Sequence, residues 1–326
     1  MNEVVPRLGV LNTSIATQNA GDQIIVDAAL MELQEVFFDR QIIQFPSHEK
    51  LSSVSRNLQK LVDMNIACGT NLLHSHMGLV KQWNVGLIDA IKLKPVILFG
   101  VGWRSHATRK TDFYTKFLLG KLLSKTHLHS VRDSYAEAKL KEIGFENVVN
   151  TGCPTLWRLD EDHCKKIPVS RGKNALVVLT DYSENMELDA ALMDVVVSKY
   201  GKVYFWCQGM HDFEYLKKLG YLSKVNVIPS SLASYNALLS DSSISLDYVG
   251  TRLHGGIRAL QSFRRTVIIG VDHRANSMGK DFDLPVIDRY EDVQRINKMI
   301  SEDLETKVAL PLENIHRWKI QFSQSV

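Results

Sequence analysis

The residues best able to do chemistry lie in the run SISLDYVGTRLHGGIRALQ, where an apolar strand leads through a short turn into a helix. Arg252 stands at the predicted helix start, and His254 follows two residues later. A helix N-terminus has unpaired N–H groups and a partial positive charge, to which Arg252 adds a planar guanidinium and His254 a group that titrates near neutrality. The pattern favours an anion site. The alternative is that Arg252 pairs with a nearby carboxylate and His254 is hydrogen-bonded at the helix start.

Two glycines, Gly255 and Gly256, follow in the first turn of the same predicted helix. Each costs about 1 kcal/mol against alanine inside a helix, so a pair needs a local reason. Close approach of the backbone to a ligand or to another segment is such a reason. Gly255 is therefore added to the predicted anion site.

A second strand-to-helix junction occurs in THLHSVRDSYAEAKL. Arg132 lies at the end of the predicted strand, and Asp133 is placed to cap the helix that follows. Taken alone, such a pair is also an ordinary surface or capping feature. With Arg252, however, it gives one arginine per predicted domain, and two guanidinium groups could hold one small polyanion.

A third junction, NTSIATQNAGDQ, lacks the glycine patterns of nucleotide-binding loops. Asp22 would repel a phosphate at this helix start, so Asn19 and Asp22 are predicted to bind hydroxyl groups, unless Asp22 is only an N-cap. The turn GVGWRS brings Trp103 and Arg104 to a strand end, where an indole face would suit a sugar ring. The alternative for Trp103 is ordinary packing.

Other common reaction centres find no support in the sequence. The histidines that could be imagined as ligands lack the acidic and histidine neighbours of a metal site, so no metal is expected. No G-x-S-x-G motif and no CxxC pair occurs. The histidines in question are His74, His76, His127, His129 and His273, and the cysteines are Cys68, Cys153, Cys164 and Cys207.

Short apolar runs alternate with segments of helical period, which predicts βα units around parallel sheets. A chain of 326 residues is expected to divide into two such domains. The predicted strands are 7–12, 41–45, 64–68, 95–101, 126–131 and 148–152, followed by 174–180, 202–207, 225–228, 243–247 and 266–271.

A charged stretch without an apolar pattern separates these two groups of strands and is predicted to be the linker. The expected organisation is an N-terminal domain over 1–160, a linker over 161–171, a C-terminal domain over 172–303, and a helix over 304–326. That last helix has the period to pack back onto the N-terminal domain.

The overall charge excludes some partners. The 39 basic and 36 acidic residues give a formal charge of +3, too even for a nucleic-acid surface. No apolar run approaches the roughly 18 residues of a membrane span, and no leader segment is visible. We therefore expect a cytoplasmic protein. Peripheral contact with the inner face of the membrane stays open, and the sequence predicts no oligomeric state.

The run TRLHGGIRAL resembles the RLHG signature of the polysaccharide pyruvyl transferase family. Other landmarks follow in the same order as in that family: the loop at Asn19 to Asp22, the glycine turn at 100–102, the strand end at Arg132, and the TGCP segment at 151–154. The first loop reads NAGD instead of a glycine-richer version. The family's basic residue after the last strand has two candidates here, Arg274 and Lys280.

The resemblance implies a GT-B-like α/β fold with two facing Rossmann-type domains and an inter-domain cleft. It also implies phosphoenolpyruvate as co-substrate, no cofactor, and a sugar acceptor, free or lipid-linked, that receives a cyclic pyruvate ketal. The donor-binding residues carried over are Arg132, Arg252 and His254, with Lys280 as a further cation. His254 is the expected general acid, and Asp22 the expected base.

Two other functions remain open from the sequence. A nucleotide-sugar glycosyltransferase uses the same fold, and Asp247 could serve its nucleotide. A non-catalytic protein that binds a sugar or an anion would also account for the basic and histidine residues.

Overall fold

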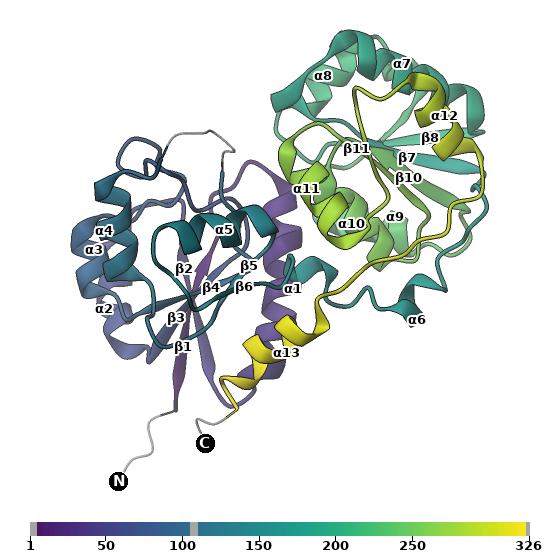
Figure 1. Cartoon of the computed structure of the whole chain (residues 1–326). Helices are drawn as coiled ribbons and strands as arrows, with labels where there is room; N and C mark the ends of the chain where they lie inside the picture. The colour runs from purple at the N-terminus through teal and green to yellow at the C-terminus, as the bar shows by residue number, and fades with distance from the viewer. Residues whose placement is uncertain (1–4, 105–109, 324–326) are drawn as a thin grey trace. The chain divides into compact units, whose positions relative to one another are not determined.

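The computed structural model describes residues 5–104 and 110–323 of the chain, which form two units. Unit 1 comprises the chain up to Thr17, Ile25–Trp157 and the chain from Pro311 on. Unit 2 comprises Gln18–Ile24 and Arg158–Leu310. Both are layers of helices on parallel strands (Figure 1), so the predicted α/β class is confirmed.

Unit 1 contains a four-stranded sheet of order β2-β1-β3-β4, and a two-stranded sheet, β5-β6. Val101, just beyond β4, bridges to Val131 of β5, so the second sheet continues the first. The strands are β1 (Arg7–Asn12), β2 (Gln41–Pro46), β3 (Met64–Cys68), β4 (Val96–Phe99), β5 (His129–Val131) and β6 (Val148–Asn150). The helices are α1 (Ala20–Val36), α2 (Ser53–Leu58), α3 (Leu87–Lys92), α4 (Phe113–Leu122), α5 (Ser134–Glu142) and α13 (Leu312–Ile320).

Alternate residues of these strands face opposite layers of helices, as the two-residue period of a strand requires. On one face, Leu98 packs with buried residues of α4 and α5, among them Leu118 and Leu140. On the other face, Phe99 packs with residues of α1 and with Trp318 of α13. The Phe99 and Trp318 rings stack with centroids 4.4 Å apart. The C-terminal helix is therefore part of the core of unit 1.

Unit 2 is built on one six-stranded parallel sheet of order β12-β11-β10-β7-β8-β9. This is the strand order of the dinucleotide-binding fold, in which β7 and β10 flank the point where the order reverses. The strands are β7 (Asn174–Val178), β8 (Lys202–Trp206), β9 (Asn226–Ile228), β10 (Leu246–Gly250), β11 (Thr266–Gly270) and β12 (Val286–Asp288). The helices are α6 (Glu161–Cys164), α7 (Met186–Lys199), α8 (Asp212–Leu219), α9 (Leu232–Ser240), α10 (Leu253–Gln261), α11 (His273–Phe282) and α12 (Val293–Ser301).

The structure corrects several predicted boundaries. The strand predicted at 243–247 is β10, which begins three residues later, because Asp241 binds the backbone and hydroxyl of Ser243 in a turn. Strand β12 was not predicted. The predicted linker 161–171 begins with helix α6, capped by Asp160, and lies in unit 2.

The C-terminal stretch also differs from a single continuous helix. Helix α12 ends at Ser301, residues 303–311 have no regular structure, and α13 begins at Leu312. Pro311 stands at the N-cap position of α13, where its missing N–H group costs no helical hydrogen bond. The last three residues of the predicted 304–326 segment lie outside the described residues.

Candidate functional site

The switch point of the unit 2 sheet places Arg252 at the carboxyl ends of two neighbouring strands. Thr251, just after β10, donates its backbone N–H to the Val178 carbonyl of β7 at 2.8 Å. Its hydroxyl also donates to the hydroxyl of Thr180, 2.8 Å away. Open α/β sheets bind ligands at this edge, so Arg252 lies where a ligand site is expected.

Arg252 is, however, already paired with two carboxylates. Its side chain is 3% exposed, and its Nη2 lies 2.8 Å from Asp181 Oδ1 and also contacts the fully buried Asp212. Its Nε donates to the Leu179 carbonyl at 3.1 Å. The alternative given for Arg252, a carboxylate partner, is what the structure contains.

Asp212 is held by the loop after β8 as well as by Arg252. The backbone N–H groups of Gln208 and Gly209 donate to its Oδ2 at 3.0 and 2.7 Å. Burial raises the pKa of Asp212, although Arg252 and the N–H of Gly209 act in the opposite direction. Burial also lowers the pKa of Arg252, but the neighbouring acids raise it above its ordinary value, so the guanidinium stays charged.

A second arginine, Arg274, lies at the same edge, in the first turn of α11. The ring of Tyr182 lies close to both arginines, with its centroid 5.0 Å from Cζ of Arg252 and 5.6 Å from Cζ of Arg274. Arg274 pairs with Asp272 and keeps 26% of its side chain exposed. Burial raises the pKa of Asp272, but Arg274 and the helix N–H groups lower it to about 2. Arg274 is thus the more accessible cation of this edge.

The segment Gln18–Ile24 completes this edge of unit 2. The backbone N–H of Ala20 donates to the Gln208 carbonyl at 2.9 Å, and Nε2 of Gln208 donates to Asn19 Oδ1 at 2.9 Å. Asn19 also accepts from the N–H of Gly21, so its side chain serves the start of α1. Asp22 lies in the first turn of that helix. Burial lowers the pKa of Arg274, whereas Tyr182, Asp272 and, to a smaller extent, Asp22 raise it above its ordinary value.

His254 and the two glycines lie in the first turn of α10, all buried. A Cβ on Gly255 would lie 2.9 Å from Gln208 Oε1, and one on Gly256 would lie 2.5 Å from Ile268 Cγ1. Both glycines are therefore explained by protein segments that approach the helix. This geometry does not support the prediction that Gly255 binds the donor. His254, two residues after Arg252, lies at the ligand-binding edge.

Arg132 occupies the corresponding strand end in unit 1. Its side chain is 1% exposed, contacts Asn71 Oδ1, and lies 3.4 Å from Asp133 Oδ2. Asp133 caps α5 as predicted, since it accepts the N–H of Ala136 at 2.8 Å. A Cβ on Gly102 would collide with the guanidinium of Arg132, so the glycine turn makes room for that group. Like Arg252, Arg132 is paired with its own acid.

The structure does not support the sugar contact predicted for Trp103. Trp103 is 1% exposed and belongs to the core of unit 1, with its indole N–H donor 3.3 Å from Ser75 Oγ. It therefore has no free face for a sugar, and packing was the correct alternative. Arg104, which follows it, is exposed and donates to Gln82 Oε1 at 2.8 Å.

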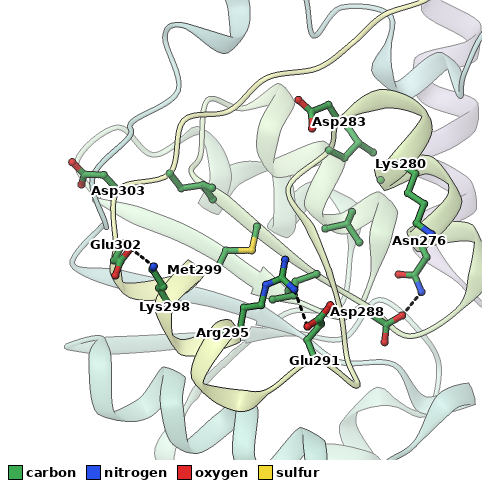
Figure 2. Close-up of a pocket in the computed structure, with 15 residues that line it drawn as sticks. Asn276, Lys280, Asp283, Asp288, Glu291, Arg295, Lys298, Met299, Glu302 and Asp303 are labelled. Atoms are coloured by element: carbon green, nitrogen blue, oxygen red, sulfur yellow. Dashed lines mark hydrogen bonds and ion pairs between the residues drawn. The ribbon is translucent and has the colours of Figure 1, made fainter.

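Lys280 belongs to a different part of unit 2 from Arg252 and His254. It lines a cavity of about 950 Å³ between α11 and α12. Figure 2 shows Lys280 and Asn276 on one side of this cavity and Lys298 and Glu302 on the other. Of the two basic candidates after the last predicted strand, Arg274 is the one at the ligand-binding edge, because it stands in the first turn of α11 and Lys280 stands near the end of that helix.

Sequence reasoning missed the acids and the tyrosine of this edge. Asp181 and Tyr182 follow β7, and Asp212 begins α8, but none stands in a motif that marks it. Their only signal is position, since each comes shortly after a buried strand. In the described part of the chain, no group of histidine, cysteine and acidic residues is arranged to hold a metal ion. Nor is any helix of that part long and apolar enough to cross a bilayer.

Comparison with solved structures shows similarity in fold. Two structures of UDP-GlcNAc 2-epimerase from Methanocaldococcus jannaschii are 12% and 11% identical to this chain, with TM-scores of 0.52 and 0.53. The first is in complex with UDP-GlcNAc and UDP. In each case 97% of this chain and 98% of the epimerase are covered. At such identities the likeness concerns the fold alone, and the fold is of the GT-B class.

Comparison of the sequence with known families gives a more specific result. No curated protein matches the chain. A model of the polysaccharide pyruvyl transferase family, however, matches residues 19–273, which is well over half of the sequence. The match includes Asn19, Arg132, Arg252, His254 and, at its end, His273. The chain belongs to the polysaccharide pyruvyl transferase family.

Proposed function

We propose that this protein transfers the pyruvyl group of phosphoenolpyruvate to two hydroxyl groups of a sugar, forming a cyclic ketal and releasing phosphate. Family membership supports the transfer of a pyruvyl group to a carbohydrate. The observation that carries the choice of donor is the pair of arginines, Arg252 and Arg274, that share the ring of Tyr182 at the switch point of unit 2. His254 belongs to the same edge.

The donor has to displace a carboxylate from one of these arginines, because both are already paired. Asp181 and Asp272 keep 15% and 22% of their side chains exposed, whereas Asp212 is fully buried. We propose that the donor displaces one of these two partly exposed acids, while the buried Asp212 continues to orient Arg252. A phosphate or carboxylate oxygen of the donor then takes the vacated position, where a guanidinium offers it paired N–H donors.

The reaction needs three proton movements. One acceptor hydroxyl oxygen bonds to C2 of the donor as the methylene carbon gains a proton, which we assign to His254 as general acid. Phosphate then leaves with the electrons of its C–O bond, and the second hydroxyl oxygen bonds to C2. Its proton leaves with the phosphate. Asp22, close enough to Arg274 to affect its pKa, is the proposed base for the first hydroxyl.

The sequence-based clamp of two arginines from different domains is not part of this proposal. Arg132 and Arg252 belong to different units, and each has an acidic partner of its own. We therefore base donor binding on unit 2 and retain Arg132 as a donor contact only by its match to the family motif.

The test is to incubate the protein with phosphoenolpyruvate and a panel of aryl and lipid-linked glycosides. We expect phosphate release that depends on a glycoside, together with the mass of an added pyruvyl group. The rival assignment predicts instead that a nucleotide sugar, and not phosphoenolpyruvate, raises the melting temperature. That result, with no phosphate release, would overturn the proposal.

Asp247, the residue named for the nucleotide-sugar alternative, is not open to a ligand. Asp247 is 2% exposed, lies 3.0 Å from Arg265 Nη1, and accepts the hydroxyl of Tyr200 at 2.8 Å. It is a structural member of the sheet, near the start of β10 and away from the edge where Arg252 lies.

The role of His254 is tested by His254→Asn, which keeps a polar side chain of similar size but cannot transfer a proton. Loss of a general acid lowers kcat by about a hundredfold to ten-thousandfold. The Michaelis constant for phosphoenolpyruvate should change little, and the melting temperature should stay close to that of the parent. Nearly normal turnover at saturating donor would show that His254 is not the acid.

A further inference from the structure

An exposed surface of unit 1 combines apolar side chains with several lysines. We call it the α3–α4 face and define its apolar part as Leu79, Ile88, Ile91, Phe113 and Phe117. These side chains are exposed to 84%, 63%, 70%, 82% and 44%. Isolated exposed apolar residues need no explanation, but five on neighbouring segments do.

The segments of this face lie side by side. Helices α3 and α4 contact each other and are neighbours in Figure 1. The loop that carries Leu79 is fixed to α4, because the backbone N–H of Met77 donates to Thr115 Oγ1 at 2.9 Å. Within α4 the rings of Phe113 and Phe117 are stacked, with centroids 6.4 Å apart. The apolar tips therefore form a surface and are not scattered.

Each helix is amphipathic with respect to the core of unit 1. In α3, Asp89 and Ala90 are buried, while Ile88 and Ile91 are exposed. The inward-facing residues complete the packing of the core. Packing within unit 1 therefore does not explain why the outward-facing positions carry apolar side chains. In α4 the buried residues are Thr115, Leu118, Leu119 and Leu122, and the exposed ones include Phe113, Lys116, Phe117 and Lys121.

The charge of the face is one-sided. Lys81, Lys92, Lys116 and Lys121 are exposed on or beside it, and none of them forms an ion pair with another described residue. The acids of the same segments are turned away or occupied. Asp89 is buried and pairs with Arg56, and Asp112 caps α4 and pairs with His76.

We propose that the α3–α4 face binds the surface of a lipid bilayer that contains anionic lipids. Helices with apolar tips and lysines lie in the headgroup region, where the tips enter the acyl boundary and the ammonium groups meet lipid phosphates. Lysine is depleted from the cores of protein interfaces, so this composition fits a membrane better than a second protein. The proposal does not depend on the identity of the donor or the acceptor.

The test is sedimentation of the full chain with vesicles of phosphatidylcholine alone and of phosphatidylcholine with phosphatidylglycerol. We expect binding to the anionic vesicles that weakens as salt is added. The double variant Ile91→Ser, Phe113→Ser should lose most of this binding. The double variant Lys116→Gln, Lys121→Gln should weaken it by roughly fivefold for each lysine, because one lysine near an anionic surface contributes about 1 kcal/mol.

Matched variants away from the face control for general effects. Phe38→Ser removes an apolar side chain that is 85% exposed elsewhere on unit 1, and Lys217→Gln, Lys224→Gln removes two exposed lysines of unit 2. Both should bind vesicles as the parent does. Melting temperatures of all four variants should stay near that of the parent, since every changed side chain is exposed.

Three results would overturn the proposal. The parent protein could fail to bind anionic vesicles, or the face variants could bind as well as the controls. The parent could also form a dimer in sedimentation equilibrium that the Ile91→Ser, Phe113→Ser variant dissociates, which would make the face an interface between two copies of this chain.

Discussion

At the level of single residues, the decisive feature is that the predicted arginines are not free charges. Arg252 contacts both Asp181 and Asp212, and Arg132 lies beside Asp133. Removing one partner of a buried ion pair is strongly destabilising because it leaves the other charge without compensation. These acids therefore fix the orientation of the guanidinium groups, and a donor anion competes with them.

Replacement of Arg252 by lysine tests that arrangement. Lysine keeps the charge but cannot contact Leu179, Asp181 and Asp212 together, so a donor oxygen would lose a fixed partner. Loss of one charge-assisted hydrogen bond, worth about 1.5 to 3 kcal/mol, raises the KM for phosphoenolpyruvate by about tenfold or more. The KM is measured from steady-state phosphate release. Lys280→Met is the control and should leave KM unchanged, because Lys280 lines the cavity between α11 and α12 and does not belong to the edge where Arg252 lies. An unchanged KM in Arg252→Lys would exclude Arg252 from donor binding.

The ion pair of Asp272 with Arg274 predicts a loss of stability in acid. The folded-state pKa of Asp272 is about 2, below the value of about 4 for an unfolded aspartate. Its contribution, at most about 2.5 kcal/mol, is complete above pH 4 and is lost as the pH falls toward 2. Asp272→Asn keeps the helix cap but not the charge. Urea unfolding gives the free energy of unfolding of this variant and of the parent. The difference between the two free energies should narrow as the pH falls. A difference that stays constant over that range would contradict this account.

At the level of elements, the position of helix α10 depends on how closely its first turn approaches the sheet. Gly256 lies against Ile268 of β11, and the hydroxyl of Tyr235 donates to the Gly255 carbonyl at 2.7 Å. This approach places the start of α10, with Arg252 and His254, at the edge of the sheet. The glycines therefore position the site through their contacts with neighbouring segments.

Gly256→Ala is expected to be destabilising although alanine favours helices. The new Cβ would meet Ile268 Cγ1 at 2.5 Å, and crowding of this kind in a packed core costs about 1–3 kcal/mol. Gly120→Ala in α4 is the matched control, because no atom lies within 4 Å of its added Cβ. It should stabilise by up to about 1 kcal/mol. Urea unfolding measures both, and equal effects of the two changes would refute the packing explanation.

At the level of the whole chain, unit 1 is completed by residues from both ends of the sequence. Trp318 of α13 is fully buried among Phe99, Trp157 and Phe322, with ring centroids 4.4 to 5.8 Å away. The C-terminal helix thus contributes to the same core as β1 and α1. Loss of this helix should expose one face of the unit 1 sheet.

Trp318→Ala tests that dependence. Truncation of a buried tryptophan costs about 3–5 kcal/mol, so the midpoint of urea unfolding should fall markedly. Arg317→Ala, one residue earlier and exposed, should change stability by less than about 0.5 kcal/mol. If both variants unfold alike, α13 does not contribute to the core as described.

Local sequence was enough to predict the α/β class, most strands to within a few residues, the Asp133 cap and the family signature around Arg252. Strand period, helix capping and a short motif are all properties of adjacent residues, so no knowledge of the fold is needed to recognise them. The same patterns did not reveal β12, the true start of β10, or the burial of Trp103. The burial of Trp103 in particular depends on which segments pack against it.

The partners of Arg252 and the choice of Arg274 over Lys280 required the folded chain. Asp181 and Asp212 are 71 and 40 residues away from Arg252, and they meet it because parallel strands end at one edge in an order that the sequence does not state. Arg274 and Lys280 differ by less than two turns of α11, yet only the first turn of the helix reaches that edge. Ion pairs between residues so far apart in the sequence depend on the order of the strands and the direction of the helices. Neither of these can be predicted from the propensities of adjacent residues.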